Sequence, residues 1–280
     1  MSIIQAVVLA VIQGLTEFFP VSSSGHLVLA RWLFGWDPFV DEPHLELAFD
    51  VAVHLGTLTG AIAYFWRDLV RYATAGMAIV VDGDRRRAGD VDGRIAWLLV
   101  LSAVPAALVG VFLVDSGEGG GSNIALVAGA LIVFGLVLGW ADRRRGGRDA
   151  TGFRLVDALL MGAGQAMALQ PGVSRSGATI TVARAMGFGR DTATRLSFLM
   201  SIPVIAGAGL LSAVDVFGDG GVPPAFRSAF AAGFVVSALT GWAAVWATLR
   251  IVRTRSFDMF VAYRVVLGVA VLAVLASPWR

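Results

Sequence analysis

Two polar segments interrupt long apolar stretches of the sequence, and the first carries three kinds of reactive side chain. It reads Glu17-Phe-Phe-Pro-Val-Ser-Ser-Ser-Gly-His26. A carboxylate, hydroxyls and an imidazole this close together can supply a general base, a nucleophile and a general acid. Serine runs often form simple turns, a single histidine is usually structural, and Glu17 could pair with an arginine. The combination of all three side chains favours a catalytic segment.

The second segment, Pro171-Gly-Val-Ser-Arg-Ser-Gly-Ala-Thr179, has the composition of an anion-binding loop. Its glycines let the backbone approach a ligand closely, and its hydroxyls can donate hydrogen bonds. The helix that follows would present unpaired N–H groups to an anion. Arg175 adds a planar guanidinium that suits phosphate oxygens. The alternative is an arginine that reaches to a membrane surface, but its position between two serines in an apolar stretch favours anion binding.

Gln13 and Glu17 lie four residues apart, so both face one side of a helix. Together with phosphate oxygens of a substrate they could hold a hard divalent cation. They are therefore our candidate metal ligands, although the residues alone do not demand a metal. The sequence has no His-Glu-x-x-His motif, no cluster of paired histidines and no cysteine.

The composition predicts an integral membrane protein. Of the 280 residues 57% are hydrophobic and 15% are charged, against roughly 25% charged in an average soluble domain. Such a chain is too apolar for a soluble enzyme and for a disordered protein. The sequence has 22 basic and 20 acidic residues, for a net charge of +2. It lacks the basic surface interleaved with aromatic residues that is typical of nucleic-acid binding. We therefore expect membrane lipids as partners and no nucleic acid.

Six apolar segments are long enough to span a bilayer, which takes about 20 residues. They are residues 45–66, 95–114, 124–141, 191–214, 228–249 and 259–277. Two further apolar regions, 3–34 and 155–187, are each broken by one of the polar segments. Irregular backbone at membrane depth persists only where it is buried in protein or lines a wet cavity. We therefore predict two re-entrant helix hairpins with functional tips, and no cleaved signal peptide.

The arginines predict the orientation in the membrane. Loops 67–94, 142–154 and 250–258 hold fourteen arginines, whereas the alternate loops 115–123 and 215–227 hold one. Because basic loops stay in the cytoplasm, the first three loops are predicted to be cytoplasmic. Residues 35–44 are then outside, so the first hairpin enters from the outer face and the second from the cytoplasm.

The two interrupted regions also resemble each other in sequence. Each has a glutamine twelve residues before the glycine of a Ser-Gly pair, Gln13 before Gly25 and Gln165 before Gly177. Together with the opposite topology, this predicts an inverted repeat, which places a site near the membrane midplane. The expected fold is all-α, with six spans and two re-entrant hairpins in one membrane domain. Its repeats are residues 1–150 and 151–280.

The stretches Gln13-Gly-Leu-Thr-Glu-Phe-Phe-Pro-Val-Ser-Ser-Ser-Gly-His-Leu27 and Pro171-Gly-Val-Ser-Arg-Ser-Gly-Ala-Thr-Ile180 resemble the two signature motifs of the undecaprenyl-diphosphate phosphatase family, also called bacitracin-resistance proteins. Order, chain length and number of spans agree, so the resemblance covers essentially the whole chain. It implies a membrane phosphatase that cleaves an isoprenoid lipid diphosphate to monophosphate and inorganic phosphate. This reaction recycles the lipid carrier for cell-wall glycans, with the site facing outward.

The resemblance also implies roles for single residues and a divalent cation, Mg²⁺ or Ca²⁺. The implied catalytic residues are Glu17, Ser23, His26 and Arg175. The expected substrate-binding residues are Gln13, Ser22, Ser24, Ser174, Ser176, Gly177 and Thr179. Gln13 departs from the glutamate of many members, which leaves a single carboxylate and weakens a metal site. In the expected mechanism Ser23 or a water attacks the terminal phosphorus, His26 moves a proton, and Glu17 orients His26 or holds the cation.

For several polar residues, and for the function as a whole, the sequence leaves alternatives open. Asp50 and His54 either line the site or make a structural hydrogen bond, and Gln165 either lines the cavity or bonds a neighbouring helix. Four arginines are expected near the membrane edges, in contact with lipid headgroups or reaching toward the interface: Arg184, Arg190, Arg195 and Arg264. A homodimer is left open. The competing functions are a lipid or anion transporter or flippase, since inverted repeats are typical of transporters, and a purely structural scaffold.

Overall fold

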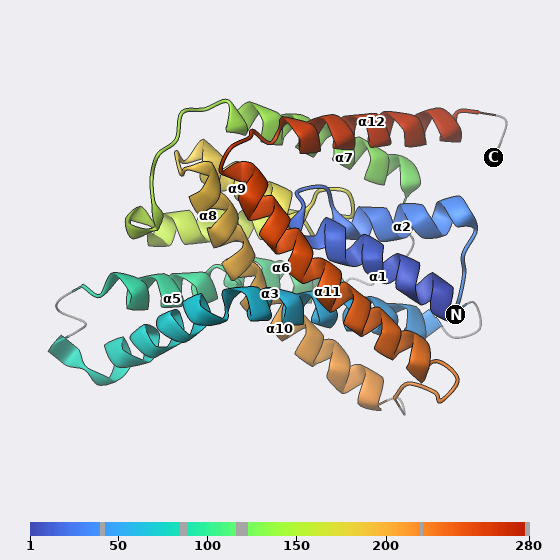
Figure 1. Ribbon diagram of the computed structural model, residues 1–280, viewed down its shortest axis with the longest axis horizontal. Coiled ribbons are helices and arrows are strands. Elements are labelled where there is room, and N and C mark those ends of the chain that lie inside the picture. Colours follow the sequence, from blue (N-terminus) through green and yellow to red (C-terminus); the bar gives the residue numbers. More distant parts are fainter. Residues whose placement is uncertain (40–42, 85–88, 116–122, 219–220, 278–280) are drawn as a thin grey trace.

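The computed structural model describes residues 1–39, 43–84, 89–115, 123–218 and 221–277, and these ranges form helices and no β-strand. The predicted all-α class is therefore confirmed. In chain order, as coloured in Figure 1, the helices are α1 (Ile3–Phe18), α2 (Ser23–Phe34), α3 (Pro43–Val81), α5 (Val91–Leu101), α6 (Val104–Asp115), α7 (Ile124–Asp142), the 3-10 helix η1 (Ala150–Gly152), α8 (Leu155–Met167), α9 (Arg175–Ala185), α10 (Arg190–Gly218), α11 (Arg227–Val252) and α12 (Asp258–Leu275).

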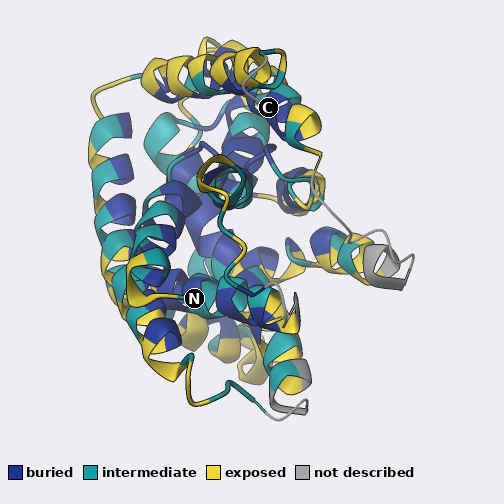
Figure 2. Ribbon diagram, turned by 90° about the vertical axis from the view of Figure 1, so that its right-hand side faces the viewer, coloured by how far each residue is buried: buried dark blue, intermediate teal, exposed yellow. Residues whose placement is uncertain are grey.

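Six helical stretches in the described residues are long and apolar enough to cross a membrane, which agrees with the six predicted segments. They are His44–Val81, Val91–Val111, Ile124–Asp142, Arg190–Val214, Arg227–Val252 and Asp258–Leu275. Their outward faces carry large apolar side chains such as Leu108, Leu136 and Leu239. Figure 2 shows exposed residues on the outside of the helices and buried ones toward the middle. Such surfaces suit contact with lipid rather than water.

Two of the spans differ from the predicted boundaries. Helix α3 continues to Val81, so residues 67–81 are helical rather than part of a loop. No proline or polar cluster stops the helix there, and the Trp97 Nε1 of α5 donates to the Gly76 carbonyl at 3.1 Å. The second span is divided into α5 and α6, because Pro105 cannot donate a helical hydrogen bond. At this break the Ser102 carbonyl accepts from Gln165 Nε2 at 3.1 Å, so Gln165 bonds a neighbouring element.

The two interrupted regions form two pairs of short helices, α1–α2 and α8–α9. These helices have 16, 12, 13 and 11 residues, each too short to cross the hydrocarbon core, which takes about 20. The non-helical residues between them, 19–22 and 168–174, overlap the two polar segments singled out in the sequence, whose remaining residues lie in the flanking helices. In Figure 1 the two connecting loops meet in the middle of the molecule. Helix α1 packs on α11, which packs on α3, while α12 packs on α7.

Asp142 at the end of α7 joins three chain segments that are far apart in sequence. Its carboxylate pairs with Arg184 Nε at 3.2 Å and Arg190 Nε at 2.7 Å, and it accepts from the Phe257 amide at 3.1 Å. Arg184 is 4% exposed, and Arg195 pairs with Asp68 at 2.7 Å. The expectation that Arg184 contacts lipid headgroups is therefore corrected, because this buried side chain is paired within the protein, as buried charges require. Arg190 and Arg195 also have carboxylate partners, but their side chains are 36% and 31% exposed, so their contact with headgroups stays a prediction.

We predict that Asp142→Asn lowers the free energy of unfolding by about 3–5 kcal/mol, because it leaves the buried Arg184 without an anion. Asp191→Asn is the matched control, since Asp191 pairs with Arg253 at 2.9 Å but is 39% exposed. The control should cost about 1 kcal/mol or less. Thermal denaturation in detergent measures both. Equal melting temperatures for the two variants would contradict the role of Asp142.

Candidate functional site

The tips of the two helix pairs have the same backbone conformation at matching positions. Ser22 precedes α2 with φ 79°, and Ser174 precedes α9 with φ 75°. No other non-glycine residue in the described ranges has positive φ, a conformation that costs of order 1–3 kcal/mol. Each serine hydroxyl accepts from the amide three residues on, Gly25 at 3.3 Å and Gly177 at 3.1 Å. Both turns are thus strained and capped in the same way.

The two tips are bonded directly to each other. The Gly172 amide donates to Ser22 Oγ at 3.0 Å, and Ser176 Oγ donates to the Phe19 carbonyl at 3.1 Å. Gly172 has φ +97°, and a Cβ there would lie 2.9 Å from the Cβ of Ala130. Only glycine fits at this position, because α7 lies directly against the second tip. Segments about 150 residues apart in the chain therefore form one compact unit.

Arg264 of α12 holds this unit together from one side. Its side chain is fully buried. Nη1 donates to the Pro20 carbonyl at 3.1 Å, and Nη2 donates to the carbonyls of Gly172 at 3.0 Å and Val173 at 2.9 Å. Nε donates to the Leu131 carbonyl of α7 at 3.2 Å. The expectation that Arg264 reaches toward the membrane interface is therefore wrong, because carbonyl groups in the centre satisfy its donors.

Glu17 is the centre of the polar cluster at the crossing. The carboxylate is nearly buried, with 5% of the residue exposed. It accepts from Ser23 Oγ at 2.5 Å, from Arg175 Nη2 at 2.5 Å and from Gln13 Nε2 at 2.9 Å. Helices α1, α2 and α9 thus bring together four residues that the sequence singled out. Glu17 does pair with an arginine, and that arginine belongs to the other tip.

Two atoms of this cluster are buried and have no hydrogen-bond partner. They are Nη1 of Arg175, a donor, and Oε1 of Gln13, an acceptor. Buried polar groups are nearly always satisfied, so an unsatisfied pair next to one carboxylate calls for an explanation. A ligand that carries both an anionic oxygen and a cation or donor would satisfy both atoms.

His54 of α3 also faces this cluster. Its Nε2 lies 3.6 Å from Glu17 Oε2, while its Nδ1 lies 2.7 Å from the Asp50 carbonyl. A carbonyl only accepts, so Nδ1 carries a hydrogen. Asp50 itself pairs with Arg31 of α2. Of the two alternatives for Asp50 and His54, both have support: His54 lines the cluster through Nε2 and makes a structural hydrogen bond through Nδ1.

His26 lies apart from the carboxylate. Its Nδ1 is 2.6 Å from the Ser22 carbonyl, and its Nε2 is 2.8 Å from the Tyr263 hydroxyl of α12. The two rings stack with centroids 5.6 Å apart. The hydrogen-bond partners of Glu17 are Gln13, Ser23 and Arg175. Of the two roles expected for Glu17, orienting His26 or holding a cation, the first therefore does not agree with the contacts in the structure.

The remaining predicted binding residues mostly build the second tip. Ser174 Oγ and Ser176 Oγ are 3.3 Å apart. Thr179 Oγ1 bonds the Arg175 carbonyl at 2.9 Å and Ser197 Oγ at 2.6 Å. The amide of Gly177 is taken by Ser174, and no hydrogen bond joins the Ser24 side chain to the cluster. Direct contact of these residues with a substrate stays a prediction.

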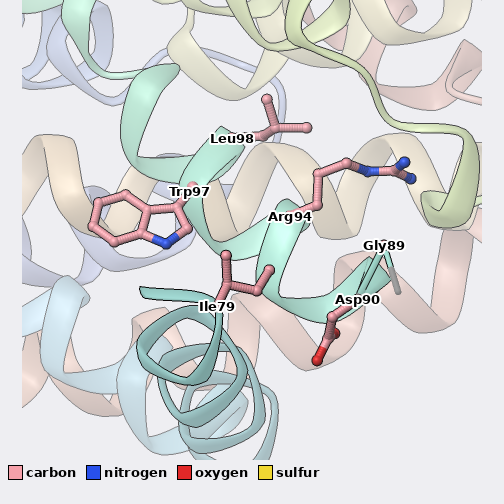
Figure 3. A pocket seen from close by; sticks show the side chains of 6 residues that line it. All are labelled: Ile79, Gly89, Asp90, Arg94, Trp97 and Leu98. Carbon is pink, nitrogen blue, oxygen red and sulfur yellow. The ribbon is translucent and has the colours of Figure 1, made fainter. Parts of the chain in front are cut away.

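A separate hollow of about 270 Å³ lies between α3 and α5, shown in Figure 3. It contains none of the residues predicted for the site. Its lining residues are Ile79, Gly89, Asp90, Arg94, Trp97 and Leu98. Arg94 donates to the Thr151 carbonyl at 2.6 Å, so its guanidinium joins α5 to η1. This hollow is not part of the polar cluster.

Comparison with known proteins gives matches over nearly the full chain. Residues 6–270 match the family model described as bacitracin resistance protein BacA. The chain is 42% identical to a protein named undecaprenyl-diphosphatase from Pelotomaculum thermopropionicum, over 99% of this chain and 98% of that one. It is also 42% identical to proteins of the same name from Thermomicrobium roseum, over 99% of both chains, and from a Nocardioides species, over 98% and 97%.

Arg264→Met should loosen both tips together, because it removes the donors that Pro20, Gly172 and Val173 share. Each buried carbonyl left unpaired costs about 1–3 kcal/mol, so the free energy of unfolding should fall by at least about 3 kcal/mol. Amide hydrogen exchange should speed up in residues 19–25 and 171–177 alike. The control is Arg227→Met, which removes an exposed bond to the Val222 carbonyl. Faster exchange at one tip only would contradict this role.

Proposed function

Since the chain belongs to the bacitracin resistance protein BacA family, we propose that it is a membrane undecaprenyl-diphosphatase. It hydrolyses a polyprenyl diphosphate to the monophosphate and inorganic phosphate. This recycles the lipid carrier for cell-wall glycan synthesis and gives bacitracin resistance. The observation that carries the proposal is the cluster of Glu17, Ser23 and Arg175 at the crossing of the two tips, with a buried guanidinium nitrogen left unpaired.

Arg175 binds the phosphate oxygens in this proposal. One guanidinium nitrogen, Nη2, is fixed by Glu17, so the direction of the unpaired Nη1 is set before the substrate arrives. A donor that needs no reorientation stabilises charge on the transferring phosphoryl group better than water does. In phosphoryl transfer most catalysis comes from this kind of positioning and charge stabilisation.

Ser23 is the nucleophile, and Glu17 is its general base. The hydroxyl already donates to the carboxylate at 2.5 Å, so its proton can move to Glu17 as the Oγ–phosphorus bond forms. The bond from the terminal phosphorus to the bridging oxygen breaks, and the prenyl monophosphate leaves. Water then cleaves the phosphoserine and releases inorganic phosphate. Attack by a water held in place of the hydroxyl is the alternative.

His26 and His54 act through Nε2, because Nδ1 of each faces a backbone carbonyl and so carries a hydrogen. His26 exchanges a proton near the leaving oxygen after its Nε2 separates from the Tyr263 hydroxyl. His54 Nε2 lies beside Glu17 and supports the charge changes on the carboxylate. Both assignments are part of the proposal.

A divalent cation, Mg²⁺ or Ca²⁺, fits the oxygens of Gln13 and Glu17 together with substrate phosphate oxygens. The unpaired, buried Gln13 Oε1 is an acceptor of the type that these ions prefer. A bound cation would neutralise negative charge on the diphosphate. Within the described residues no three His, Cys, Asp or Glu side chains form a metal-binding group, so most ligands would come from substrate and water.

The membrane arrangement is proposed from the same features. Helices α1–α2 and α8–α9 are re-entrant hairpins, in an inverted repeat of residues 1–150 and 151–280, and the site faces outward. The matching strained serines support the repeat. Loops 67–94, 142–154 and 250–258 are cytoplasmic. Arg144 and Arg250, at the ends of α7 and α11, lie over Trp140 and Trp246, and Arg67, inside α3, lies over Trp66. Tryptophan is enriched at membrane interfaces.

Arg175→Ala and Arg175→Lys should each lower kcat by about 100-fold or more, the loss typical of removing one donor to a developing charge. Phosphate release from a prenyl diphosphate in detergent measures this. Arg195→Ala, which removes an ion-paired arginine outside the cluster, is the control and should keep most activity. Near-normal hydrolysis by the Arg175 variants would contradict the proposed role. A wild-type protein that releases no phosphate would instead favour a transporter.

The covalent route predicts a phosphoserine. Acid quenching within one turnover of substrate labelled in its terminal phosphate should leave the label on the peptide that contains Ser23. Ser23→Ala should leave none, whereas Ser24→Ala, which keeps the Ser23–Glu17 bond, should still form it. Two displacements at phosphorus give net retention of configuration. Inversion, with no labelled peptide, would assign the attack to water.

A further inference from the structure

The loops that follow α7 and α11 carry an exposed patch of positive charge. Resting on the proposed membrane arrangement, in which both loops are cytoplasmic, we propose that this patch binds the headgroup of an anionic phospholipid. Its residues, which we call the basic patch, are Arg143, Arg144, Arg145 and Arg255, all of them exposed. The patch contains none of the residues of the polar cluster around Glu17, so it would be a second site on the molecule.

The two loops are adjacent in space although they are far apart in the sequence. The Phe257 amide donates to the Asp142 carboxylate at 3.1 Å. Leu138 of α7, Val252 of α11 and Phe260 of α12 pack in one buried cluster. Helices α7 and α12 also lie side by side in Figure 1. The arginines of the two loops therefore belong to one surface.

The basic patch keeps its charge because the carboxylates beside it are bonded to other arginines. Asp142 is shared by two arginines outside the patch and is 3% exposed, so the patch cannot reach it. Asp191 is paired with Arg253. Within the described ranges the four arginines of the patch have no carboxylate partner. An excess of positive charge that the protein does not neutralise attracts an anion from outside.

An apolar face borders the basic patch, which favours an amphiphilic ligand over a soluble anion. The Arg144 guanidinium lies over the Trp140 ring, 4.2 Å from its centroid, and Trp140 is 51% exposed. Leu136 and Val133 continue the same side of α7 away from the loop, and both are exposed. An acyl chain can lie along this face while the phosphate of the same molecule meets the arginines.

The chemistry of the basic patch suits a phosphodiester. A guanidinium donates two parallel hydrogen bonds to phosphate oxygens. Groups of basic residues directly cytoplasmic of a membrane helix are typical of binding to anionic headgroups, and each contributes about a fivefold factor in affinity. An acidic protein would cover the arginines but leave the apolar side of α7 bare. This difference favours the phospholipid.

The triple variant Arg143→Gln, Arg145→Gln, Arg255→Gln tests the inference. The full chain in detergent is titrated with a fluorescent phosphatidylglycerol and, separately, with a phosphatidylcholine that has the same acyl chains. The wild type should bind the anionic lipid at least about tenfold more tightly, and the triple variant should lose this preference, because each arginine contributes about fivefold. Equal affinity of the wild type and the triple variant for phosphatidylglycerol would overturn the inference.

The matched control removes the same charge from α3 and α5, through Arg67→Gln, Arg71→Gln and Arg94→Gln, which are exposed residues outside the patch. It should keep the preference for phosphatidylglycerol, and an equal loss there would overturn the inference. Displacement of the lipid by an equal concentration of inorganic phosphate would assign the patch to a free anion instead. A dimer that the triple variant disperses would assign it to a second copy of this chain.

Further measurements separate this inference from the proposals on which it rests. A wild type that binds phosphatidylglycerol but releases no phosphate from a prenyl diphosphate would refute the activity and keep the lipid site. The triple variant should release phosphate in detergent at nearly the wild-type rate, because the basic patch lies outside the polar cluster.

The cytoplasmic placement of the patch has its own test. The sequence has no cysteine, and a Cβ at Gly147 meets no atom within 4 Å, so Gly147→Cys adds a single thiol beside the patch. A membrane-impermeant maleimide should label this thiol in spheroplasts only after permeabilisation. Labelling of intact spheroplasts would overturn the placement in the cytoplasmic leaflet, whereas the titration in detergent would still decide whether the patch binds the lipid.

Discussion

The structure depends on one buried guanidinium. Arg264 has no carboxylate partner among the described residues, and its charge is balanced by carbonyls of both tips and of α7. Each tip is an interrupted helix whose carbonyls would otherwise face the centre of the molecule unpaired. A single side chain from α12 therefore satisfies groups from three other segments. The position of Glu17 relative to Arg175 follows from this, because those residues stand on opposite tips.

Where the two tips cross, a negative charge from one is paired with a positive charge from the other. The first tip contributes the carboxylate and the second contributes the guanidinium, and their pairing leaves one nitrogen free for an anion. Glu17 is thereby kept as an anion beside Ser23, while Arg175 is held in one orientation. The same contact serves folding and the proposed chemistry. Strain at Ser22 and Ser174 is tolerated because the tip-to-tip hydrogen bonds compensate for it.

Features set by nearby residues were predictable from the sequence, and those set by packing were not. Six apolar segments and two interruptions depend on local composition, and the helices follow them. The grouping of Gln13, Glu17 and Arg175 was expected from motifs. Arg264 is buried because carbonyls from distant segments accept its hydrogen bonds. Arg184 and Arg190 form ion pairs with a carboxylate that is likewise distant in sequence. His26 points toward Tyr263 because α12 packs beside the first tip, and His54 lies near Glu17 because α3 does. No local sequence pattern predicts that either helix packs against the tips.

Helix α3 has a consequence beyond its length. It runs for 39 residues with His54 about a quarter of the way along and Val81 at its end, a rod of about 58 Å. Close to His54 it lies directly against α11, because a Cβ at Gly56 or Gly60 would come within 2.5 Å of α11 atoms. Near its far end, the Gly76 carbonyl accepts from Trp97 of α5. The position of His54 beside Glu17 is therefore fixed by the contact with α11, whereas the other end of the rod is held by a different helix.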